Sequence, residues 1–349
     1  MKYDVFCMAS NESLYIADFI FHHIYKGFAN IFVGINDTSH DFTKIIVEKI
    51  SAFYPLVKIV DTNAADISNN KYSSSSYSII LKNAYTSSSS DFFLPIDVDE
   101  FFISSLLPES VEAALAPLQP FDCLTLPYID QVYAEHVCNK PLSCDKISTV
   151  FNMWTKSITS YKSALHYIAP HVPCFDKAAN PDALTVINPK GHRRVPIVHA
   201  NGSFTYNSFL EQKLPAASYL EIPFVFHQRL RSRLEYSRRC VTPWPGMGKY
   251  FYENRQGYLY TLFDSESTAI LRKLIQPSSY QMYLASLEQF LRETNVQDLV
   301  FEARQLVRTD VIEELIRSIP RQAVIDEKTT WTRTFQGTPF LGLLDEIAT

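Results

Sequence analysis

The sequence predicts an α/β fold in which a mostly parallel sheet is flanked by helices and followed by a helical C-terminal portion. Two patterns carry this prediction. Between residues 3 and 96, short apolar runs alternate with segments whose apolar residues recur at helical spacing. From about residue 279 to residue 319 only helical spacing remains, as at Tyr283, Leu287 and Phe290. Strands that alternate with helices make right-handed crossovers, and these build a parallel sheet.

Each element of the alternating part has a local signal. Runs rich in β-branched and aromatic residues indicate strands at 3–9, 30–35, 56–60 and 92–96. Ser10 and Asn11 are expected to cap a first helix, which ends at Gly27. The turn formers Asn36 and Asp37 precede a second helix. The second and third helices are expected near 42–52 and 77–85.

Composition narrows the class of protein. The chain has 349 residues, of which 46% are hydrophobic and 20% charged, as in folded globular proteins. A formal net charge of -5 argues against a dedicated nucleic-acid binder. The first residues lack a signal-peptide pattern and no run of about 20 apolar residues follows, so we expect a cytoplasmic protein, with a peripheral contact at the inner face of the membrane left open. In that compartment the six scattered cysteines should be free thiols.

Missing motifs remove several enzyme classes. The sequence has no G-x-G-x-x-G, no Walker A loop and no G-x-S-x-G elbow. Dinucleotide enzymes, P-loop nucleotidases and α/β-hydrolases of the usual pattern are therefore excluded.

Polar residues follow the expected strands at one edge of the sheet. Asn11 and Glu12 follow the first strand, Asp37 follows the second, and Asp97 and Asp99 follow the fourth. Parallel strands end at a common edge, and ligands of such sheets bind there. We therefore expect these side chains to line one site.

The triplet Asp97-Val98-Asp99 is the strongest chemical signal. If the fourth strand continues through it, Asp97 and Asp99 share a face while Val98 turns inward. Neighbouring carboxylates repel each other unless a cation lies between them. Their oxygen ligands suit Mn²⁺ or Mg²⁺ bound to a nucleotide diphosphate. The alternative is a solvated loop with a helix-capping aspartate.

From residue 108 to about residue 222 the pattern becomes irregular, with short apolar runs among prolines. We expect this region to shape an acceptor pocket. It contains the acidic residues Asp130, Asp176, Asp182 and Glu221. A cluster of arginines follows between residues 229 and 239. Guanidinium groups match phosphates, although ordinary charge on a helix surface is the commoner cause of such a cluster.

Five segments together carry a family resemblance. They are Ser10-Asn11-Glu12, the helix with His22-His23 and Gly27, Asn36-Asp37-Thr38-Ser39, Asp97-Val98-Asp99-Glu100-Phe101, and Phe226-His227-Gln228-Arg229-Leu230-Arg231-Ser232. With these segments, residues 3 to 240 resemble the bacterial glycosyltransferase-2-like group, which is similar to glycosyltransferase family 92. The chain departs from that group at Ser10, where lysine is usual, and at Gln228, where tyrosine is favoured.

The resemblance implies a Rossmann-like fold of the GT-A type and a metal-dependent sugar transfer. A UDP-sugar is the expected donor, Mn²⁺ or Mg²⁺ the expected cofactor, and a hydroxyl of a glycan or lipid-linked glycan the expected acceptor, as in polysaccharide biosynthesis. Inversion at the anomeric carbon is expected, and it requires a general base near the acceptor. The sequence does not choose among Asp130, Asp176, Asp182 and Glu221 for this role. Residues 1–107 would form the nucleotide-sugar half of this domain, 108–245 the acceptor half, and 246–349 a mainly helical region.

The resemblance also assigns the donor site. Asn11, Glu12, Lys82 and Asp97 are expected to contact the donor, and Asp37 is expected near the uracil or ribose. Simpler explanations remain for three of them. Asp37 also suits a turn, Glu12 also suits the first turn of a helix, and Lys82 also suits a solvated helix face.

A histidine is expected to complete the metal site with Asp97 and Asp99. By the resemblance this is His227, at the end of the apolar run 222–226. A neutral imidazole there would fill a coordination position left open by carboxylates and diphosphate. His199 is the rival, because it follows a similar apolar approach, and a buried histidine bonded to a backbone carbonyl is the alternative.

Two other functions stay open. An aspartyl phosphatase also uses an Asp-x-Asp triplet after a strand, with the first aspartate as nucleophile, but normally on the first strand rather than the fourth. A carbohydrate-binding or scaffold protein on the same fold, with an inactive site, is the alternative that is not an enzyme.

Overall fold

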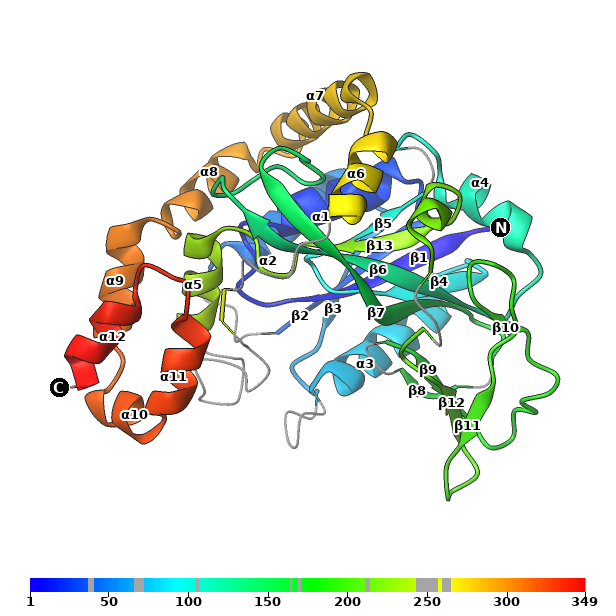
Figure 1. The fold of residues 1–349 in the computed structure, drawn as a ribbon. Helices are drawn as coiled ribbons and strands as arrows, with labels where there is room; N and C mark the ends of the chain where they lie inside the picture. Colours follow the sequence, from blue (N-terminus) through cyan, green and yellow to red (C-terminus); the bar gives the residue numbers. More distant parts are fainter. Residues whose placement is uncertain are drawn as a thin grey trace.

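The computed structural model describes residues 1–36, 41–65, 72–104, 107–163, 165–168, 171–210, 214–242, 257–258 and 265–348. It confirms the α/β class, with a curled sheet flanked by helices and a helical C-terminal part (Figure 1). Within the described residues the main sheet has nine strands in the order β3-β2-β1-β4-β7-β6-β13-β5, with β10 beside β6. Its strands are β1 (Tyr3–Ala9), β2 (Asn30–Ile35), β3 (Val57–Asp61), β4 (Phe92–Pro95), β5 (Glu100–Ile103), β6 (Cys123–Ala134), β7 (Ile147–Ser160), β10 (Val186–Ile187) and β13 (Phe224–His227).

The first four strands form the parallel part of the sheet. β1 pairs in parallel with both β2 and β4, and β2 pairs in parallel with β3. The connecting helices are α1 (Ile16–Tyr25), α2 (Thr43–Phe53) and α3 (Tyr72–Ser87). A helix therefore connects each of these strands to the next, as predicted. The prediction was possible because the spacing of apolar residues changes clearly between strand and helix segments here.

The predicted cap of the first helix is wrong. Asn11 adopts a left-handed backbone conformation with φ of 57°, so the chain turns before it enters the helix. The helix begins only at Ile16, and Tyr15 at its N-cap makes no side-chain capping bond.

The region predicted to be irregular contains the two longest strands. β6 and β7 pair in antiparallel fashion, and β7 also pairs with β4. The sequence did not reveal them because β7 buries hydroxyl and charged side chains, including Thr155 and Lys156, where an apolar alternation would be expected. β13 completes the sheet between β6 and β5, parallel to the first and antiparallel to the second.

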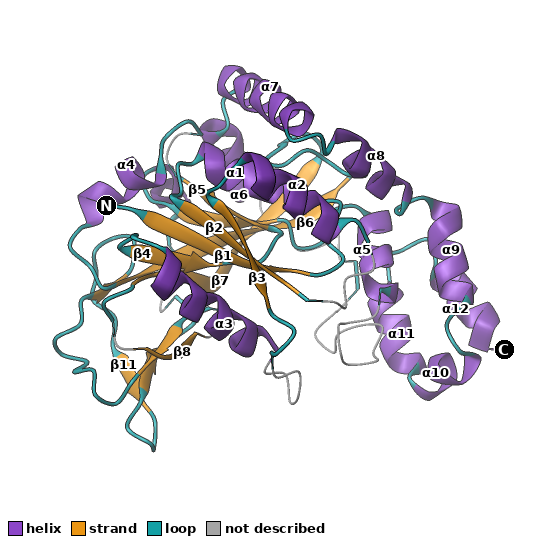
Figure 2. Cartoon of the chain, turned by 180° about the vertical axis from the view of Figure 1, so that it is seen from behind, coloured by secondary structure: helices purple, strands orange, loops and turns teal. Residues whose placement is uncertain are grey.

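Helices and a small second sheet cover the main sheet (Figures 1 and 2). α1 and α2 pack together on one face, where α7 (Pro277–Glu293) packs on α1. α3 covers the other face, with Tyr77, Ile80 and the ring of Phe93 in its buried contact. The small sheet lies beside α3 in the order β11-β12-β9-β8. Its strands are β8 (Leu165–Ile168), β9 (Pro173–Phe175), β11 (Pro196–Val198) and β12 (Phe204–Tyr206).

The C-terminal helices build a core of their own at one end of the sheet (Figure 1). Trp331, Phe335 and Ile316 pack there against Tyr236 of α5. The predicted helical periodicity is confirmed, since Tyr283 and Leu287 of α7 are buried. The helices that follow β13 are α5 (Arg233–Val241), α6 (Ser265–Leu274), α7, α8 (Gln297–Gln305), α9 (Thr309–Arg317), α10 (Arg321–Asp326), α11 (Lys328–Phe335) and α12 (Leu341–Ala348). A short helix, α4 (Val111–Leu115), precedes β6.

Candidate active site

Asp97 and Asp99 lie in a tight turn between β4 and β5, not on an extended strand. The Asp97 backbone NH donates to Glu100 Oε2 at 2.9 Å, and the Glu100 NH donates to the Asp97 carbonyl at 3.0 Å. The fourth strand ends at Pro95, so the condition under which the two carboxylates would share a face of a strand is not met, although Val98 is buried. The turn separates their environments, because the Asp97 side chain is 45% exposed and that of Asp99 only 3%.

Lys156 of β7 neutralises Asp97 and Glu100 from the buried side of the turn. Its Nζ lies 3.3 Å from Asp97 Oδ2 and 3.1 Å from Glu100 Oε2, and the side chain is fully buried. Burial disfavours the lysine charge, but the two carboxylates outweigh it and raise the pKa of Lys156. Burial raises the pKa of Glu100 to about 7 despite this lysine. Tyr128 of β6 donates its hydroxyl to Glu100 Oε1 at 2.7 Å.

Asp99 faces a different set of cations. Arg239 of α5 places Nη1 2.6 Å from Asp99 Oδ2, and Arg231 Nη2 and His227 Nε2 each lie 3.8 Å from the same oxygen. Burial would raise the pKa of Asp99, but Arg239 and His227 hold it well below its usual range. Arg231 and Arg239 of the predicted arginine cluster therefore belong to the candidate site, so ordinary charge on a helix surface does not explain the whole cluster.

His227 is oriented by Asp130, its neighbour across the β6–β13 ladder. Nδ1 of His227 lies 3.1 Å from Asp130 Oδ1, so Nε2 is left facing Asp99. Asn152 donates to Asp130 Oδ2 at 2.6 Å, and Arg229 Nη1 lies 3.4 Å from the same oxygen. Burial alone would lower the pKa of His227, but Asp99 and Asp130 raise it to about 10. Asp130 is fully buried and both its oxygens are engaged.

Three side chains at this edge are of types that ligate divalent cations. Carboxylate oxygens, as in Asp97 and Asp99, suit Mn²⁺ or Mg²⁺, and an imidazole nitrogen, as in His227, is a common ligand of divalent transition metals. A carboxylate bonded to the other ring nitrogen, as Asp130 is here, is typical of a ligand histidine. Within the described residues, no three His, Cys, Asp or Glu side chains already form a ligand cluster. Cation binding therefore requires rearrangement of the pairs with Lys156 and Arg239, and loss of the His227 proton.

A second group of side chains surrounds Arg231. Its guanidinium carbon lies 3.1 Å from the ring centre of Tyr15, whose hydroxyl donates to Glu235 at 2.8 Å. Arg231 is buried and has a left-handed backbone with φ of 58°. Among the described residues, its Nε and Nη2 have no hydrogen-bond partner. Glu12 belongs to this group, since burial raises its pKa while Arg239 and Arg231 oppose the rise.

The structure therefore brings together some predicted site residues and not others. Glu12, Asp97, Asp99, Asp130 and His227 converge at one edge of the sheet. Asn11 is next to Glu12 and partly buried. Asp37 lies outside the described residues, so its expected contact with the nucleoside stays a prediction.

Five other predicted residues are not brought to this group by any described contact. Lys82 is exposed on α3, and His199 is exposed at the end of β11 in the small sheet, so the geometry favours His227 over its rival. Glu221 is exposed before β13, beyond the end of the strand opposite to His227. Asp182 is exposed and Asp176 is half-buried near the small sheet.

Lys156 and Tyr128 are functional candidates that the sequence did not reveal. Lys156 bonds Asp97 and Tyr128 bonds Glu100, and both partners are distant in the sequence. A single lysine within the run Trp154-Thr155-Lys156-Ser157-Ile158 is the only signal in the sequence. This lysine indicates a site only when the run is known to lie on a buried strand, as it does in β7.

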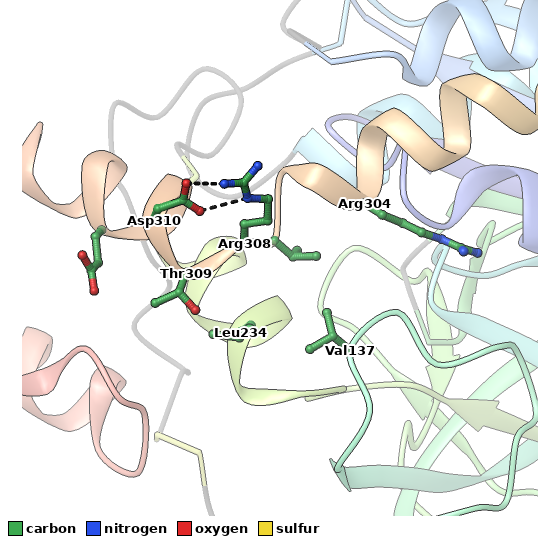
Figure 3. Close-up of a pocket in the computed structure, with 8 residues that line it drawn as sticks. Val137, Leu234, Arg304, Arg308, Thr309 and Asp310 are labelled. Carbon is green, nitrogen blue, oxygen red and sulfur yellow. Dashed lines mark hydrogen bonds and ion pairs between the residues drawn. The ribbon is translucent and has the colours of Figure 1, made fainter.

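A surface pocket of about 600 Å³ lies apart from this group, between α5, α8 and α9. Arg308 and Asp310 on its wall pair with each other, as Figure 3 shows. Its wall shares no residue with the candidate site, and we assign it no role. It is lined by Val137, Leu234, Arg304, Val307, Arg308, Thr309, Asp310 and Glu313.

Comparison with known proteins gives a weak likeness. No family model and no curated protein matches the sequence. S. aureus TarS 1–349 aligns with 14% identity over 99% of this chain and 88% of that chain, at a TM-score of 0.32. The same protein in complex with UDP aligns with 21% identity over 37% of this chain and 36% of that chain, at a TM-score of 0.28. A putative glucose-1-phosphate thymidylyltransferase from Bacillus anthracis aligns with 13% identity over 46% of this chain and 71% of that chain, at a TM-score of 0.26. Likenesses this loose carry no argument, so function rests on the site itself.

Two smaller observations complete the description. All six cysteines are free thiols. In the part of the chain that the structure describes, no helix is both long and apolar enough to cross a bilayer.

Proposed function

We propose that this protein is a glycosyltransferase that moves a sugar from a nucleotide-sugar, with a UDP-sugar as the donor, to a hydroxyl of a glycan or glycolipid. The observation that carries the proposal is the convergence of Asp97, Asp99 and His227 with two arginines at the carboxyl edge of the sheet. Carboxylates and an imidazole suit a divalent cation, while guanidinium groups suit phosphate. A nucleotide diphosphate bound through a cation satisfies both sets.

In this proposal Asp97, Asp99 and His227 hold Mn²⁺ or Mg²⁺. When bound, the cation neutralises negative charge on the departing diphosphate. Arg231 is suited to the same task, because its Nε and Nη2 make no hydrogen bond to the described residues and its backbone and ring contact fix its direction. Lys156 and Glu100 keep the turn in place from the buried side.

Asp130 acts here as the residue that orients His227, and not as the general base. A base must be able to reach the acceptor proton, whereas Asp130 is fully buried and its two oxygens already bond His227 and Asn152. Burial tends to raise the pKa of Asp130, but His227 and Asn152 hold it below its usual range, which makes it a weak base.

Replacing Asp130 tests this role. Asp130→Asn should raise the Mn²⁺ concentration needed for half-maximal turnover by about 10- to 100-fold, as expected for the loss of a carboxylate behind a metal-binding histidine. Turnover at saturating Mn²⁺ should largely recover, which a general base would not permit. Turnover of a UDP-sugar against Mn²⁺ concentration measures both quantities. Asp345→Asn, at an exposed carboxylate of α12, is the matched control.

The proposed function itself is tested by ligand-dependent stability. A panel of nucleotide-sugars with Mn²⁺ should raise the melting temperature for the true donor, because a ligand that binds only the native state stabilises it. Release of free UDP from that donor should depend on the metal. A scaffold would show no turnover, and covalent phosphate on Asp97 would indicate the phosphatase instead.

A further inference from the structure

A row of aromatic rings extends from the candidate site to the surface. The ring centre of Trp154 lies 4.5 Å from that of His171 and 3.8 Å from that of Phe209. His171 lies 6.2 Å from Tyr128, the residue that bonds Glu100. At the outer end, Phe209 is 38% exposed. The donor chemistry proposed above uses neither Trp154 nor Phe209.

A β-bulge in β7 places Trp154 in this row. Between Asn152 and Thr155 the β6–β7 register skips two residues, Met153 and Trp154. Met153 and Trp154 pair instead with residues 209–210. The Leu210 NH donates to the Met153 carbonyl at 2.7 Å, and Trp154 forms an antiparallel β-bridge with Phe209. Bulges next to functional sites commonly redirect one side chain. Here the bulge gives Trp154 an aromatic neighbour at the surface.

A buried arginine fixes the backbone that carries Phe209. Arg194 donates through Nη2 to the carbonyl oxygens of Asn207 and Phe209, both at 2.7 Å. Its Nη1 donates to Thr125 Oγ1 at 3.1 Å on β6. Exposed aromatic rings on a fixed backbone lose little entropy when a ligand covers them.

One amide side chain ties the rings to the candidate site. Asn152 Oδ1 accepts from the Trp154 backbone NH at 3.1 Å, while its Nδ2 donates to Asp130 at 2.6 Å. Asp130 in turn bonds His227. The bulge is therefore held at a set distance from the residues proposed to bind the donor.

We propose that Phe209 and Trp154 form a subsite for the pyranose ring of the acceptor. A pyranose has an apolar C–H face that stacks on an aromatic ring and hydroxyls that stay solvated or hydrogen-bonded at its edge. The row links Phe209 at the surface to Tyr128, which bonds Glu100 next to the turn of Asp97, and the proposal places the acceptor sugar at its outer end. This inference rests on the proposed function, because it identifies the acceptor as a carbohydrate with a ring.

Saccharide binding tests the subsite without any need for turnover. Saturation-transfer NMR would be measured with methyl pyranosides of glucose, galactose and N-acetylglucosamine, and with sorbitol, which has no ring. At least one pyranoside should bind and sorbitol should not. Phe209→Ala should weaken that binding by about tenfold, the loss of one stacked ring. Phe209→Tyr should restore it, because the ring is kept.

A matched control and a donor measurement separate the possible outcomes. Phe301→Ala removes another exposed ring, 62% exposed on α8, and should leave pyranoside binding unchanged. Absence of pyranoside binding, equal binding of sorbitol, or equal losses in the two alanine variants would overturn the subsite. UDP binding is measured in parallel on the wild-type protein. Pyranoside binding that depends on Phe209 in a protein that binds no UDP would keep a saccharide site at Phe209 and overturn the proposed transfer from a UDP-sugar.

Discussion

Asp97→Asn should abolish metal-dependent turnover while leaving the fold stable. Its side chain is 45% exposed, and Lys156 keeps Glu100 as a partner at 3.1 Å, so the free energy of unfolding should fall by less than about 1 kcal/mol. Loss of a metal-binding carboxylate removes several kcal/mol of transition-state stabilisation, equivalent to about a thousandfold in rate. UDP release and the melting temperature of the same preparation measure the two effects.

Asp99→Asn should be as inactive as Asp97→Asn, but it should lower the free energy of unfolding by more. Asp99 is 3% exposed and pairs with Arg239 at 2.6 Å, so the substitution removes the charge partner of an arginine. We expect a cost of about 2–3 kcal/mol, less than for a fully buried pair because Arg239 is 37% exposed. Equal free energies of unfolding for the two variants would contradict the different environments that the turn gives to Asp97 and Asp99. Metal-dependent turnover in either variant would remove that residue from the metal site.

The parallel half of the fold was predictable because each strand and helix there has its own spacing of apolar residues. The rule that parallel strands end at one edge then placed Glu12 near Asp99 without any contact information, and the structure confirms it. His227 was predictable in position from its apolar approach, which is β13. The orientation of its ring was not, because that depends on Asp130, 97 residues away.

The central antiparallel strands escaped prediction for a physical reason. The second half of β7, from Thr155 to Ser160, is buried on both faces and consists of hydroxyl side chains, one lysine and one isoleucine, so it shows no alternation of apolar and polar residues. Its polar groups are satisfied by partners far along the chain, as when Ser157 donates to the carbonyl of His171 at 3.0 Å. Such partners become visible only in three dimensions. For the same reason Arg239 resembled ordinary helix surface in the sequence and is an ion-pair partner in the structure.

Lys156→Met should cause the largest loss of stability in the sheet. The lysine is fully buried between Asp97 and Glu100, and Glu100 is 2% exposed. Removing one member of a buried charge group leaves the others uncompensated, which costs about 3–5 kcal/mol. Urea unfolding of the wild-type protein and the variant, both in the presence of a chelator, would measure the difference.

A second buried lysine provides the matched control. Lys26 of the α1 C-cap is also fully buried, but its Nζ donates to the Ser104 hydroxyl at 2.7 Å and to the Leu107 carbonyl at 3.1 Å. Burial lowers its pKa to about 7, although Glu109, which is only partly buried, opposes this. Lys26→Met removes a charge that burial already disfavours, so we expect a cost of at most about 1–2 kcal/mol.

The pH dependence of the Lys156→Met variant identifies the cause of its instability. Without the lysine, burial and mutual repulsion raise the pKa values of Asp97 and Glu100 in the folded protein above their values in the unfolded chain. The folded state then binds more protons than the unfolded state, so the free energy of unfolding rises as the pH falls from about 8 toward about 5. The gap to the wild-type protein should narrow down to about pH 5. The smaller gap for Lys26→Met should narrow only between about pH 8 and 7, because burial lowers the pKa of Lys26 to about 7 and the lysine is protonated in both the folded and the unfolded state below that pH. A Lys156→Met deficit that stays constant with pH would mean that lost packing, and not unpaired carboxylates, destabilises the sheet.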